Sequence, residues 1–416
     1  MDSLTVKLKK TKQASLQLAG LSFGDRNRLL RDVAKAISRN SKIILAANQK
    51  DLKAFGGDEP VRERLELNRK KIKGITKSIA DVAVLPDPLN RILDVRKRPN
   101  GLRISKVSVP LGVLGVIYES RPNVTVDLAV LALKTGNAIV LKGGKEAYES
   151  NKILVFLIRQ VLKKHKLPVE AVLLIDPKSD WKKDLLGAHG LVDVLIPRGS
   201  NSLINWVRKN SSLPVIETGA GVCHTFADDY NVKKSVDIIV NAKTRRPSVC
   251  NALDTFVVNK AIVKNLLRAL AAPLAEYRVK IFADAPSYHV LKNIYPAELL
   301  QKAKPEHFGV EFLSLKMSIK TVNNFTEGLD FVKKHTSGHS EAILTNNKQH
   351  ASIFLKEIDA AAVYRNASTY FTDGGQFGMG AEVGISTQKL HARGPMGLEA
   401  LTSYKWVVEG TGQIRI

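Results

Sequence analysis

The chain has 416 residues, of which 44% are hydrophobic and 25% are charged. These fractions are typical of a globular protein in water, and the length allows two or three domains. No apolar run is long enough to span a bilayer, and the first ten residues lack the features of a secretory signal. The two cysteines are too few for a disulfide framework or a thiolate zinc cluster. We therefore expect a cytoplasmic protein without a metal site.

The formal net charge of +25 is the unusual feature of the composition. It raises the possibility of nucleic-acid binding, but lysine and arginine are spread along the whole chain, and aromatic residues make up only 6%. No basic stretch is interleaved with aromatic residues, as a base-stacking surface would need. The pattern argues against a nucleic acid as the main partner. It favours a surface field that attracts small anions, such as a phosphorylated substrate or cofactor.

Apolar residues at helical spacing dominate the first ninety residues. They predict helices over residues 25–37, 43–54 and 61–84. Two strand-like arms follow in residues 92–109, on either side of Pro99-Asn100-Gly101. Because this tripeptide favours a tight turn, we predict a protruding hairpin.

From Pro110 onward, short apolar strands alternate with helices. The predicted strands are residues 113–118, 138–141, 171–175, 192–196 and 214–216, and the predicted helices are 124–134, 146–165 and 200–209. A second series includes strands at 222–226, 255–258, 342–344 and 361–364, and a final strand spans 401–408. This alternation is typical of a doubly wound parallel sheet with right-handed crossovers.

Cys250 carries the strongest chemical signal. It follows a basic, proline-broken segment that contains Arg245 and Arg246, and a strand-like run begins soon after it. A thiol in that setting is placed to lose its proton and act as a nucleophile. The alternative role is that of a small buried hydrophobe. That alternative suits Cys223 better, because residues 222–226 are typical of a core strand.

Two strand-to-helix junctions are candidate phosphate sites, although no G-x-G-x-x-G joins a strand to a helix. The first is Lys142-Gly143-Gly144-Lys145, where backbone N–H groups at a helix start and two lysines would attract a phosphate. The second is Gly199-Ser200, which follows the same logic. Such turns are also common connectors, so both assignments are hypotheses.

His335 and His339 are four residues apart, which is the spacing of a zinc pair on a helix. Gly338 lies between them, and the sequence offers no third ligand. We therefore interpret the segment as a turn that enters a strand, close to the substrate.

Long motifs along the chain resemble the gamma-glutamyl phosphate reductases, or glutamate-5-semialdehyde dehydrogenases, of the aldehyde dehydrogenase superfamily. They are residues 110–125, 141–147, 196–199, 221–224, 241–251, 335–342, 366–369 and 384–399. The resemblance spans nearly the whole chain. It implies an aldehyde dehydrogenase-like α/β fold with a doubly wound cofactor domain, an α/β catalytic domain and a small β oligomerisation element.

The resemblance also implies domain boundaries. Residues 1–90 and 110–218 would form the NADPH-binding domain, and residues 219–395 the catalytic domain. Residues 91–109 and 401–416 would form the oligomerisation hairpin and terminal strand. Since an exposed hairpin edge needs a partner, we expect a homodimer or a larger homo-oligomer.

The activity that the resemblance implies is NADPH-dependent reduction of L-glutamyl 5-phosphate to L-glutamate 5-semialdehyde and phosphate, the second step of proline biosynthesis. Cys250 would attack the acyl phosphate, and the thioester would accept a hydride. Asn123 stands at the oxyanion-hole position of the superfamily, and a helix cap after Pro122 is a compatible second role. There is no amino-acid kinase domain, so a functional link to a separate glutamate 5-kinase is expected.

Cofactor contacts follow from the same motifs. Lys142 matches the lysine that holds the adenosine ribose, and Lys142 and Lys145 would face the 2′-phosphate of NADPH. Gly199 and Ser200 match the turn at the pyrophosphate. Glu311 matches the glutamate on the nicotinamide ribose, with an ordinary solvated carboxylate as the alternative.

Glu217 matches the glutamate that activates water in oxidising aldehyde dehydrogenases. A reductase must not hydrolyse its thioester, so we expect Glu217 to contact the nicotinamide end at most. An enzyme that oxidises a free aldehyde to a carboxylic acid with NAD(P) is the nearest alternative function. An inactive, basic nucleic-acid-binding relative is the second alternative, against which the presence of Cys250, Asn123 and Lys142 argues.

Residues with the chemistry to bind the carboxylate, ammonium or phosphate of the substrate occur in the matching motifs. They are Arg121, Arg246, Asn366, Ser368 and Arg393. For each, a structural ion pair or cap is the alternative. Arg365 departs from the family, which usually has a small apolar residue there, and it would add a charge near the supposed pocket.

Overall fold

The computed structural model describes residues 3–119 and 121–415. Ser120 of the 110–125 motif and positions 1, 2 and 416 of the predicted terminal segments lie outside this description. The chain forms two compact units. The first comprises Met1–Thr218, Gly378–Gly384 and Leu390–Ile416, and the second comprises Gly219–Phe377 and Ile385–Lys389.

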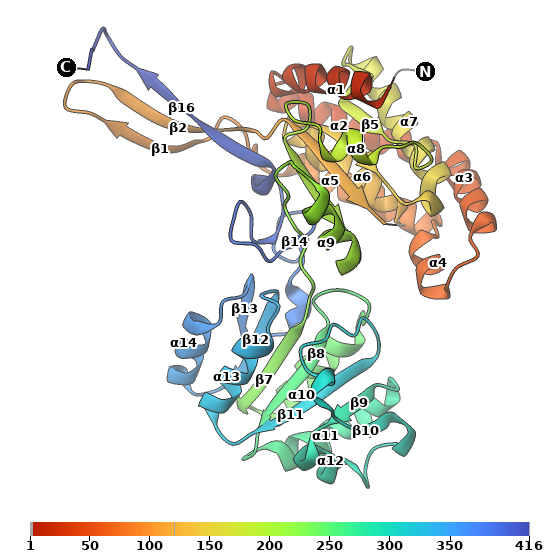
Figure 1. The fold of residues 1–416 in the computed structure, drawn as a ribbon, viewed down its shortest axis with the longest axis vertical. Coiled ribbons are helices and arrows are strands. Elements are labelled where there is room, and N and C mark those ends of the chain that lie inside the picture. Colours follow the sequence, from red (N-terminus) through yellow and green to blue (C-terminus); the bar gives the residue numbers. More distant parts are fainter. Residues whose placement is uncertain (1–2, 120, 416) are drawn as a thin grey trace. The chain divides into compact units, whose positions relative to one another are not determined.

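The first unit combines helices with a parallel sheet and an antiparallel arm (Figure 1). Its helices are α1 (Leu4–Ala19), α2 (Phe23–Arg39), α3 (Ser41–Ala54), α4 (Glu59–Leu65), α5 (Arg69–Val84), α6 (Pro122–Lys134), α7 (Tyr148–Lys164), α8 (Lys182–Leu186) and α9 (Asn201–Asn210). Its strands are β1 (Ile92–Lys97), β2 (Arg103–Pro110), β3 (Val113–Tyr118), β4 (Ala138–Lys142), β5 (Val172–Leu174), β6 (Val194–Arg198), β15 (Gly394–Pro395) and β16 (Thr402–Glu409).

The parallel sheet of this unit has the strand order β5-β4-β3-β6. The chain starts at β3, adds β4 and β5 on one side, and then returns to add β6 on the other. The direction of winding therefore reverses between β3 and β6, where Tyr118 pairs with Arg198. In open α/β sheets, ligands bind outside the carboxyl ends of the strands at such a reversal.

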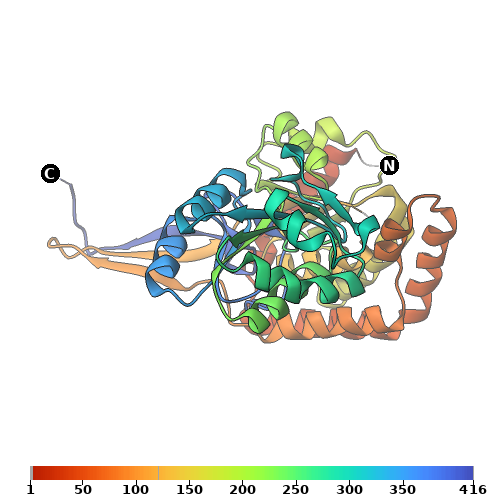
Figure 2. The same ribbon diagram turned by 90° about the horizontal axis from the view of Figure 1, so that it is seen from below.

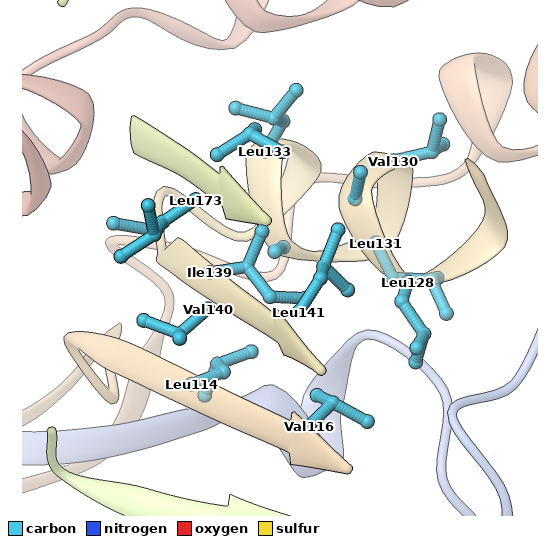
Figure 3. Close-up of a cluster of buried hydrophobic side chains, with 14 of the residues drawn as sticks. Leu114, Val116, Leu128, Val130, Leu131, Leu133, Ile139, Val140, Leu141 and Leu173 are labelled. Atoms are coloured by element: carbon cyan, nitrogen blue, oxygen red, sulfur yellow. The ribbon is translucent and has the colours of Figure 1, made fainter. Parts of the chain in front are cut away.

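The core of the first unit lies between this sheet and its helices. Every residue of β3 is buried, as expected for a parallel strand that is covered on both faces. Leu114 and Val116 of β3, Ile139 and Leu141 of β4, and Leu131 of α6 lie in one apolar cluster (Figure 3). Burial of each such side chain contributes about 1.5–3 kcal/mol, so the cluster fixes where β3 and β4 end.

Two predicted elements of this unit differ from the structure. The helix predicted over 61–84 is interrupted, because the side chain of Asn68 accepts the N–H of Lys71 (2.9 Å) and starts α5 as a new helix. The predicted strand 214–216 forms only one bridge, between Leu195 and Val215. Pro214 has no N–H to donate to a ladder, so the pairing does not extend.

The arm is an antiparallel sheet in the order β1-β2-β16. It extends from the helices of its own unit in both views (Figures 1 and 2). Apolar side chains on it are exposed, among them Ile92, Tyr404 and Trp406. Lys106 Nζ lies 3.7 Å from the centroid of the Tyr404 ring, and such a cation covers part of the aromatic face. The role of the arm in oligomerisation stays a prediction.

The second unit is built on one parallel sheet in the order β10-β9-β11-β8-β7-β12-β13. Its strands are β7 (Cys223–Asp229), β8 (Leu253–Asn259), β9 (Lys280–Ala283), β10 (Leu300–Lys302), β11 (Lys316–Val322), β12 (Ser340–Thr345), β13 (Ala362–Arg365) and β14 (Ile385–Ser386). Its helices are α10 (Val232–Thr244), α11 (Val263–Glu276), α12 (Ala285–Leu291), α13 (Phe325–His335) and α14 (Lys348–Glu357). The amino end of this sheet positions Cys250, the candidate nucleophile.

The predicted catalytic segment 219–395 differs from the second unit at its C-terminal end. Residues 378–384 and 390–395 group with the first unit. The N–H of Val383 donates to the carbonyl of Met396 (2.9 Å), and the N–H of Met396 donates to that of Gly384 (2.8 Å). The backbone bonds tie this returning segment to the terminal segment, a pairing that strand patterns alone do not reveal.

Among the helices that the structure describes, none is both long and apolar enough to cross a membrane.

A buried polar network fixes the start of α7, the helix that follows the Lys142–Lys145 turn. Asn48 is fully buried, donates to the carbonyl of Leu65 (2.9 Å) and to Ser150 Oγ (3.1 Å), and accepts the N–H of Leu67 (2.7 Å). Asp51 accepts the N–H of Ser150 (2.8 Å). The network joins α3 and the segment after α4 to the first turn of α7.

Replacing Asn48 by alanine should therefore leave buried backbone groups without partners. We expect Asn48→Ala to lower the free energy of unfolding by about 2–4 kcal/mol. Urea unfolding followed by circular dichroism would measure it. Lys50→Ala, an exposed change on the same helix, is the matched control and should stay within about 0.5 kcal/mol. Equal stability of the two variants would contradict the network's importance.

Candidate active site

Cys250 lies half-buried in the irregular turn between α10 and β8. The turn stands at the amino edge of the sheet of the second unit, where β7 begins at Cys223 and β12 begins at Ser340. Arg245 and Arg246 are exposed on the same segment. The guanidinium of Arg245 lies 5.8 Å from the centroid of the Tyr370 ring. The Cys250 turn is thus partly open to solvent.

A glycine holds the backbone of this turn in place. A Cβ atom on Gly221 would lie 1.7 Å from the carbonyl oxygen of Cys250 and 2.7 Å from its Cα. Atoms cannot approach so closely, so any side chain at position 221 would force the Cys250 turn to move. The absence of a side chain at Gly221 lets β7 enter directly beneath the turn.

Cys223 supports the same carbonyl from the core. Its side chain is fully buried, and Sγ donates to the carbonyl oxygen of Cys250 at 3.2 Å. Burial raises the pKa of the Cys223 thiol well above its usual value, and the nearby carboxylate of Asp254 adds to the effect. Cys223 is therefore a neutral core donor, in agreement with the strand predicted around it.

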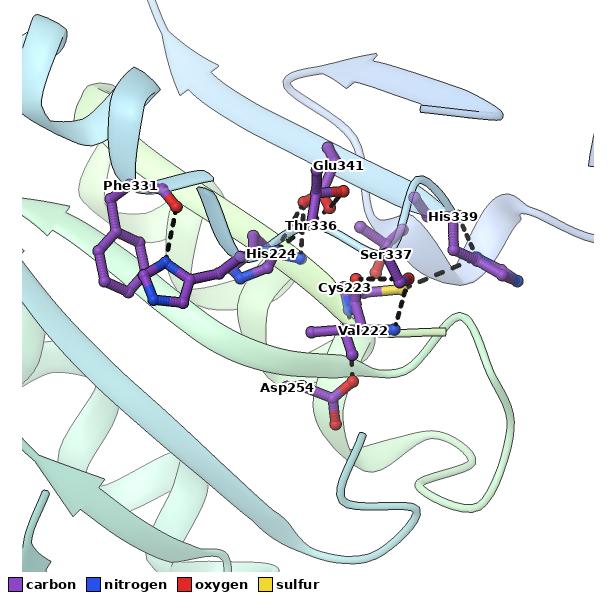
Figure 4. Close-up of polar contacts among 12 residues, drawn as sticks. Val222, Cys223, His224, Asp254, Phe331, Thr336, Ser337, His339 and Glu341 are labelled. Atoms are coloured by element: carbon purple, nitrogen blue, oxygen red, sulfur yellow. Dashed lines mark hydrogen bonds and ion pairs between the residues drawn. The ribbon is translucent and has the colours of Figure 1, made fainter. Parts of the chain in front are cut away.

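A chain of buried polar groups continues from Cys223 (Figure 4). Cys223 Sγ lies 3.8 Å from His339 Nδ1, and this nitrogen lies 2.8 Å from Ser340 Oγ. Ser340 Oγ lies 2.6 Å from Thr372 Oγ1. Asn251, the residue after Cys250, donates to the carbonyl of Thr372 (2.9 Å). The segment after β13 is thereby fixed to the Cys250 turn.

Asp254 joins the turn to the predicted cofactor loop. Its carboxylate accepts the N–H of Cys223 (3.3 Å) and the N–H of Phe312 (2.9 Å). Lys243 Nζ lies 4.0 Å away, and both side chains are almost fully buried. Burial raises the pKa of Asp254 and lowers the pKa of Lys243, and each charge opposes the shift of the other. The sequence did not predict this pair, because Asp254 lies outside the motifs and the contact with Lys243 depends on how α10 packs on β8.

Glu311 lies beside the contact between Gly221 and the Cys250 turn. Its Oε1 accepts the N–H of Gly221 at 3.1 Å. Burial raises the pKa of Glu311, and the Gly221 hydrogen bond opposes that shift. The carboxylate is therefore part of the support of the Cys250 turn, and its predicted contact with a ribose stays a prediction.

The predicted substrate residues of the second unit are not all on one edge. Ser368 caps the 3-10 turn that carries Thr369, whose hydroxyl donates to the carbonyl of Asn251 (2.8 Å). Asn366 follows the carboxyl end of β13, and its side-chain amide bonds both the N–H (2.8 Å) and the carbonyl (3.1 Å) of Thr345. Its φ of 55° explains an asparagine in this left-handed position. The Asn366 side chain thus supports the edge opposite to the Cys250 turn.

The first candidate phosphate turn, in the first unit, is Lys142 to Lys145. Lys142 ends β4, and its Nζ lies 4.9 Å from the centroid of the Trp181 ring. Burial lowers the pKa of Lys142, while the charge of Glu146 opposes this shift. A Cβ on Gly143 would lie 2.5 Å from Asn151 Nδ2. Gly143 therefore allows close packing on α7, and Gly144 precedes the 3-10 turn that leads into this helix.

The second candidate turn, Gly199-Ser200, already holds a carboxylate. Glu119 Oε1 accepts the N–H of Ser200 at 3.0 Å and its hydroxyl at 2.9 Å. Gly199 has a φ of 157°, and a Cβ there would lie 2.5 Å from the Glu119 carboxyl carbon. Sequence analysis missed Glu119, because its contact with position 200 depends on the β3–β6 register.

The remaining predicted site residues of the first unit are placed as follows. Asn123, in the first turn of α6, donates to Asp127 Oδ2 at 3.3 Å. Burial raises the pKa of Asp127, and the Asn123 hydrogen bond opposes the shift. Arg121 occupies the N-cap position of α6, and Asn123 lies inside the first turn, so the helix-cap role that we allowed for Asn123 is wrong. Glu217 lies 3.6 Å from Arg208, and Arg393 is half-buried just before β15.

The histidines at the entrance to β12 lie on different elements. α13 ends at His335, and His339 lies in the turn before Ser340. Within residues 3–119 and 121–415, no group of three or more His, Cys, Asp or Glu side chains could hold a metal ion. His224 and Glu341 form a further buried pair at 3.0 Å (Figure 4), which sequence analysis also missed.

His339 makes the second unit sensitive to acid. Burial lowers the pKa of its imidazole from 6.5 to about 4. Because the folded state disfavours the protonated form, His339 contributes stability above pH 6.5 that is lost as the pH falls toward 4. The loss should reach about 3 kcal/mol.

Urea unfolding at several pH values would test this expectation. His339→Gln should lose less stability between pH 6.5 and 4 than the wild type does. His189→Gln, at an exposed position, is the matched control and should keep the wild-type dependence. A His339→Gln curve parallel to the wild type would contradict the assignment.

Comparisons with known proteins show the family to which the chain belongs. The aldehyde dehydrogenase family model matches residues 5–286. The gamma-glutamyl phosphate reductases of Chlorobium phaeobacteroides and Bacteroides thetaiotaomicron are each 51% identical to the chain, over 100% and 97% of it and 99% and 96% of their own lengths. The crystal structure of the Thermotoga maritima gamma-glutamyl phosphate reductase superposes with a TM-score of 0.94 at 42% identity, covering 100% of both chains. The chain therefore belongs to the gamma-glutamyl phosphate reductases, within the aldehyde dehydrogenase family.

Proposed function

We propose that this protein reduces L-glutamyl 5-phosphate to L-glutamate 5-semialdehyde and phosphate with NADPH, in proline biosynthesis. Family membership supports the reaction class. The observation that carries the proposal is the Cys250 turn, a half-buried thiol on a backbone held by Gly221 and Cys223. A nucleophile needs accessibility together with a fixed position, and this turn provides both.

Cys250 is the proposed nucleophile. Its thiolate attacks the acyl phosphate carbonyl carbon, a C–S bond forms, and the C–O bond to phosphate breaks. Phosphate leaves with that electron pair and takes up a proton from solvent. When bound, the cofactor supplies the hydride that reduces the thioester. The C–S bond then breaks, the aldehyde leaves, and Cys250 regains its thiolate.

Asn123 is the proposed oxyanion donor, on the strength of its place in the 110–125 motif. Its side-chain amide bonds Asp127 in the same helix, which orients the amide within the first turn of α6. Removal of one oxyanion donor typically lowers turnover about 100- to 1,000-fold.

The first unit has a donor set that fits an anionic dinucleotide. Ser200 offers an N–H and a hydroxyl at the start of α9, and these two groups already hold a carboxylate. Lys142 and Lys145 stand at the carboxyl end of β4 and would face the 2′-phosphate of NADPH. The same residues give NADP(H) an electrostatic advantage over NAD(H).

Glu217 is proposed to act other than as a hydrolytic base. Its carboxylate lies 3.6 Å from the guanidinium of Arg208, so the two side chains form an ion pair. Such an ion pair also restrains the side chain, which suits an enzyme that must protect its thioester from water.

The anionic substrate is proposed to bind basic and polar residues of the matching motifs. Arg246 on the Cys250 segment, Arg121 and Arg393 are the basic candidates, and Ser368 and Asn366 are the polar ones. Since Asn366 uses its amide on Thr345, we assign it a supporting role. Homo-oligomerisation through the arm, a cytoplasmic location and a link to a separate glutamate 5-kinase remain predictions of the family resemblance.

Cys250→Ala should lower the rate at least about a thousand-fold, because no other group replaces the thiolate. The assay is phosphate-dependent oxidation of glutamate semialdehyde with NADP+. Cys223→Ala, which removes the buried thiol, is the matched control and should keep more than about a tenth of the rate. An active Cys250→Ala variant would overturn the mechanism. Phosphate-independent formation of glutamate would favour the oxidising alternative.

Gly221→Ala should misplace the Cys250 turn without unfolding the protein. We expect kcat/KM to fall about a hundred-fold, because small displacements of a nucleophile are costly. Gly74→Ala is the control, since a Cβ there meets nothing within 4 Å on helix α5. That control should keep full activity and gain a little stability. A Gly221→Ala enzyme with wild-type kcat/KM would rule out the proposed constraint.

A further inference from the structure

We propose that Glu119 is an internal ligand of the anion-binding turn at the start of α9, and that a cofactor phosphate binds there only by displacing it. The inference rests on the proposed function, in which Gly199 and Ser200 hold the cofactor pyrophosphate. It adds a residue of this chain that sets the affinity for the cofactor.

The first support is the geometry of the turn. Both donors of Ser200, its N–H and its hydroxyl, are used by the same oxygen of Glu119, at 3.0 and 2.9 Å. The carboxyl group also fills the space that a Cβ on Gly199 would need. A phosphate oxygen that takes these donors therefore cannot coexist with the carboxylate.

The topology of the parallel sheet in the first unit supports the proposal independently of those hydrogen bonds. Glu119 directly follows β3, and Gly199 directly follows β6. These are the two strands between which the winding of the sheet reverses. The carboxyl ends of strands at such a reversal form the crevice in which open α/β sheets bind their ligands. The carboxylate thus occupies the position that the fold offers to a ligand.

The third support is that the carboxylate can leave. Glu119, Gly199 and Ser200 are all exposed, so a displaced carboxylate would enter water at little cost. The backbone stays tied, because the N–H of Glu119 donates to the carbonyl of Arg198 (3.3 Å) and the N–H of Arg121 to that of Glu119 (2.8 Å). A rotation of the Glu119 side chain is therefore sufficient to open the turn.

Titration with NADPH, followed by its fluorescence, tests the proposal without measuring turnover. Glu119→Ala should bind NADPH about threefold to tenfold more tightly than the wild type, because the competing charge at the helix start is removed. Glu119→Gln should shift affinity in the same direction by a smaller factor. The glutamine retains an oxygen that can accept the hydrogen bonds of Ser200. This variant therefore shows whether the effect of Glu119→Ala comes from a rearranged turn instead of the lost charge. Glu63→Gln, an exposed glutamate on α4, is the charge-matched control and should bind as the wild type does.

Ser200→Ala separates the two hypotheses. It should weaken NADPH binding if the pyrophosphate uses this turn. If it does so while both Glu119 variants bind like the wild type or more weakly, the displacement proposal is wrong and the cofactor site stands. If the wild type does not bind NADPH, or Ser200→Ala leaves its affinity unchanged, the proposed cofactor site and this inference both fail.

Discussion

The backbone carbonyl of Cys250 fills the space that a side chain at position 221 would need, and the amino edge of the second unit depends on that contact. A Cβ at 221 would lie 1.7 Å from this oxygen. Close packing of this kind transmits any displacement, because protein interiors have little free volume. The proposed nucleophile, Cys250, is therefore placed by a backbone contact between two segments that are 29 residues apart in the chain.

Side chains around that contact hold the amino edge of the sheet of the second unit in place. Cys223 donates to the same carbonyl, and Asp254 accepts N–H groups from Cys223 and Phe312. Each of these groups would be costly to bury without its partner. The neutral states of His339 and of the Cys223 thiol follow from the same burial. The edge therefore combines a fixed backbone at Cys250 with buried polar groups that have hydrogen-bond partners.

The sequence predicted elements with a regular apolar pattern well. It predicted poorly which side chains of different elements contact one another. β3 was predicted with its observed limits, Val113–Tyr118, because a doubly covered parallel strand is a continuous apolar run. Segment 214–216 was predicted as a strand from the same kind of run, but Pro214 limits it to one bridge. The partners of Glu119, Asp254 and Glu311 depend on register and crossover, and no local pattern encodes these. Local sequence setting singled out Cys250 and Ser200 as candidates without revealing which groups surround them.

Each unit has a glutamate that accepts a backbone N–H at a glycine-containing turn, and the two glutamates differ in how deeply they are buried. Glu311 accepts the N–H of Gly221, and Glu119 accepts the N–H of Ser200 next to Gly199. The half-buried Glu311 has a raised pKa because burial disfavours its charge, so moving it would disturb the packed edge under Cys250. Glu119 is exposed, and water can replace its two hydrogen bonds at small cost. The Glu311 carboxylate supports the turn of the proposed nucleophile and has to stay in place. The Glu119 carboxylate is proposed to occupy the position of a cofactor phosphate and has to be able to move away. The difference in burial between Glu311 and Glu119 meets these two requirements.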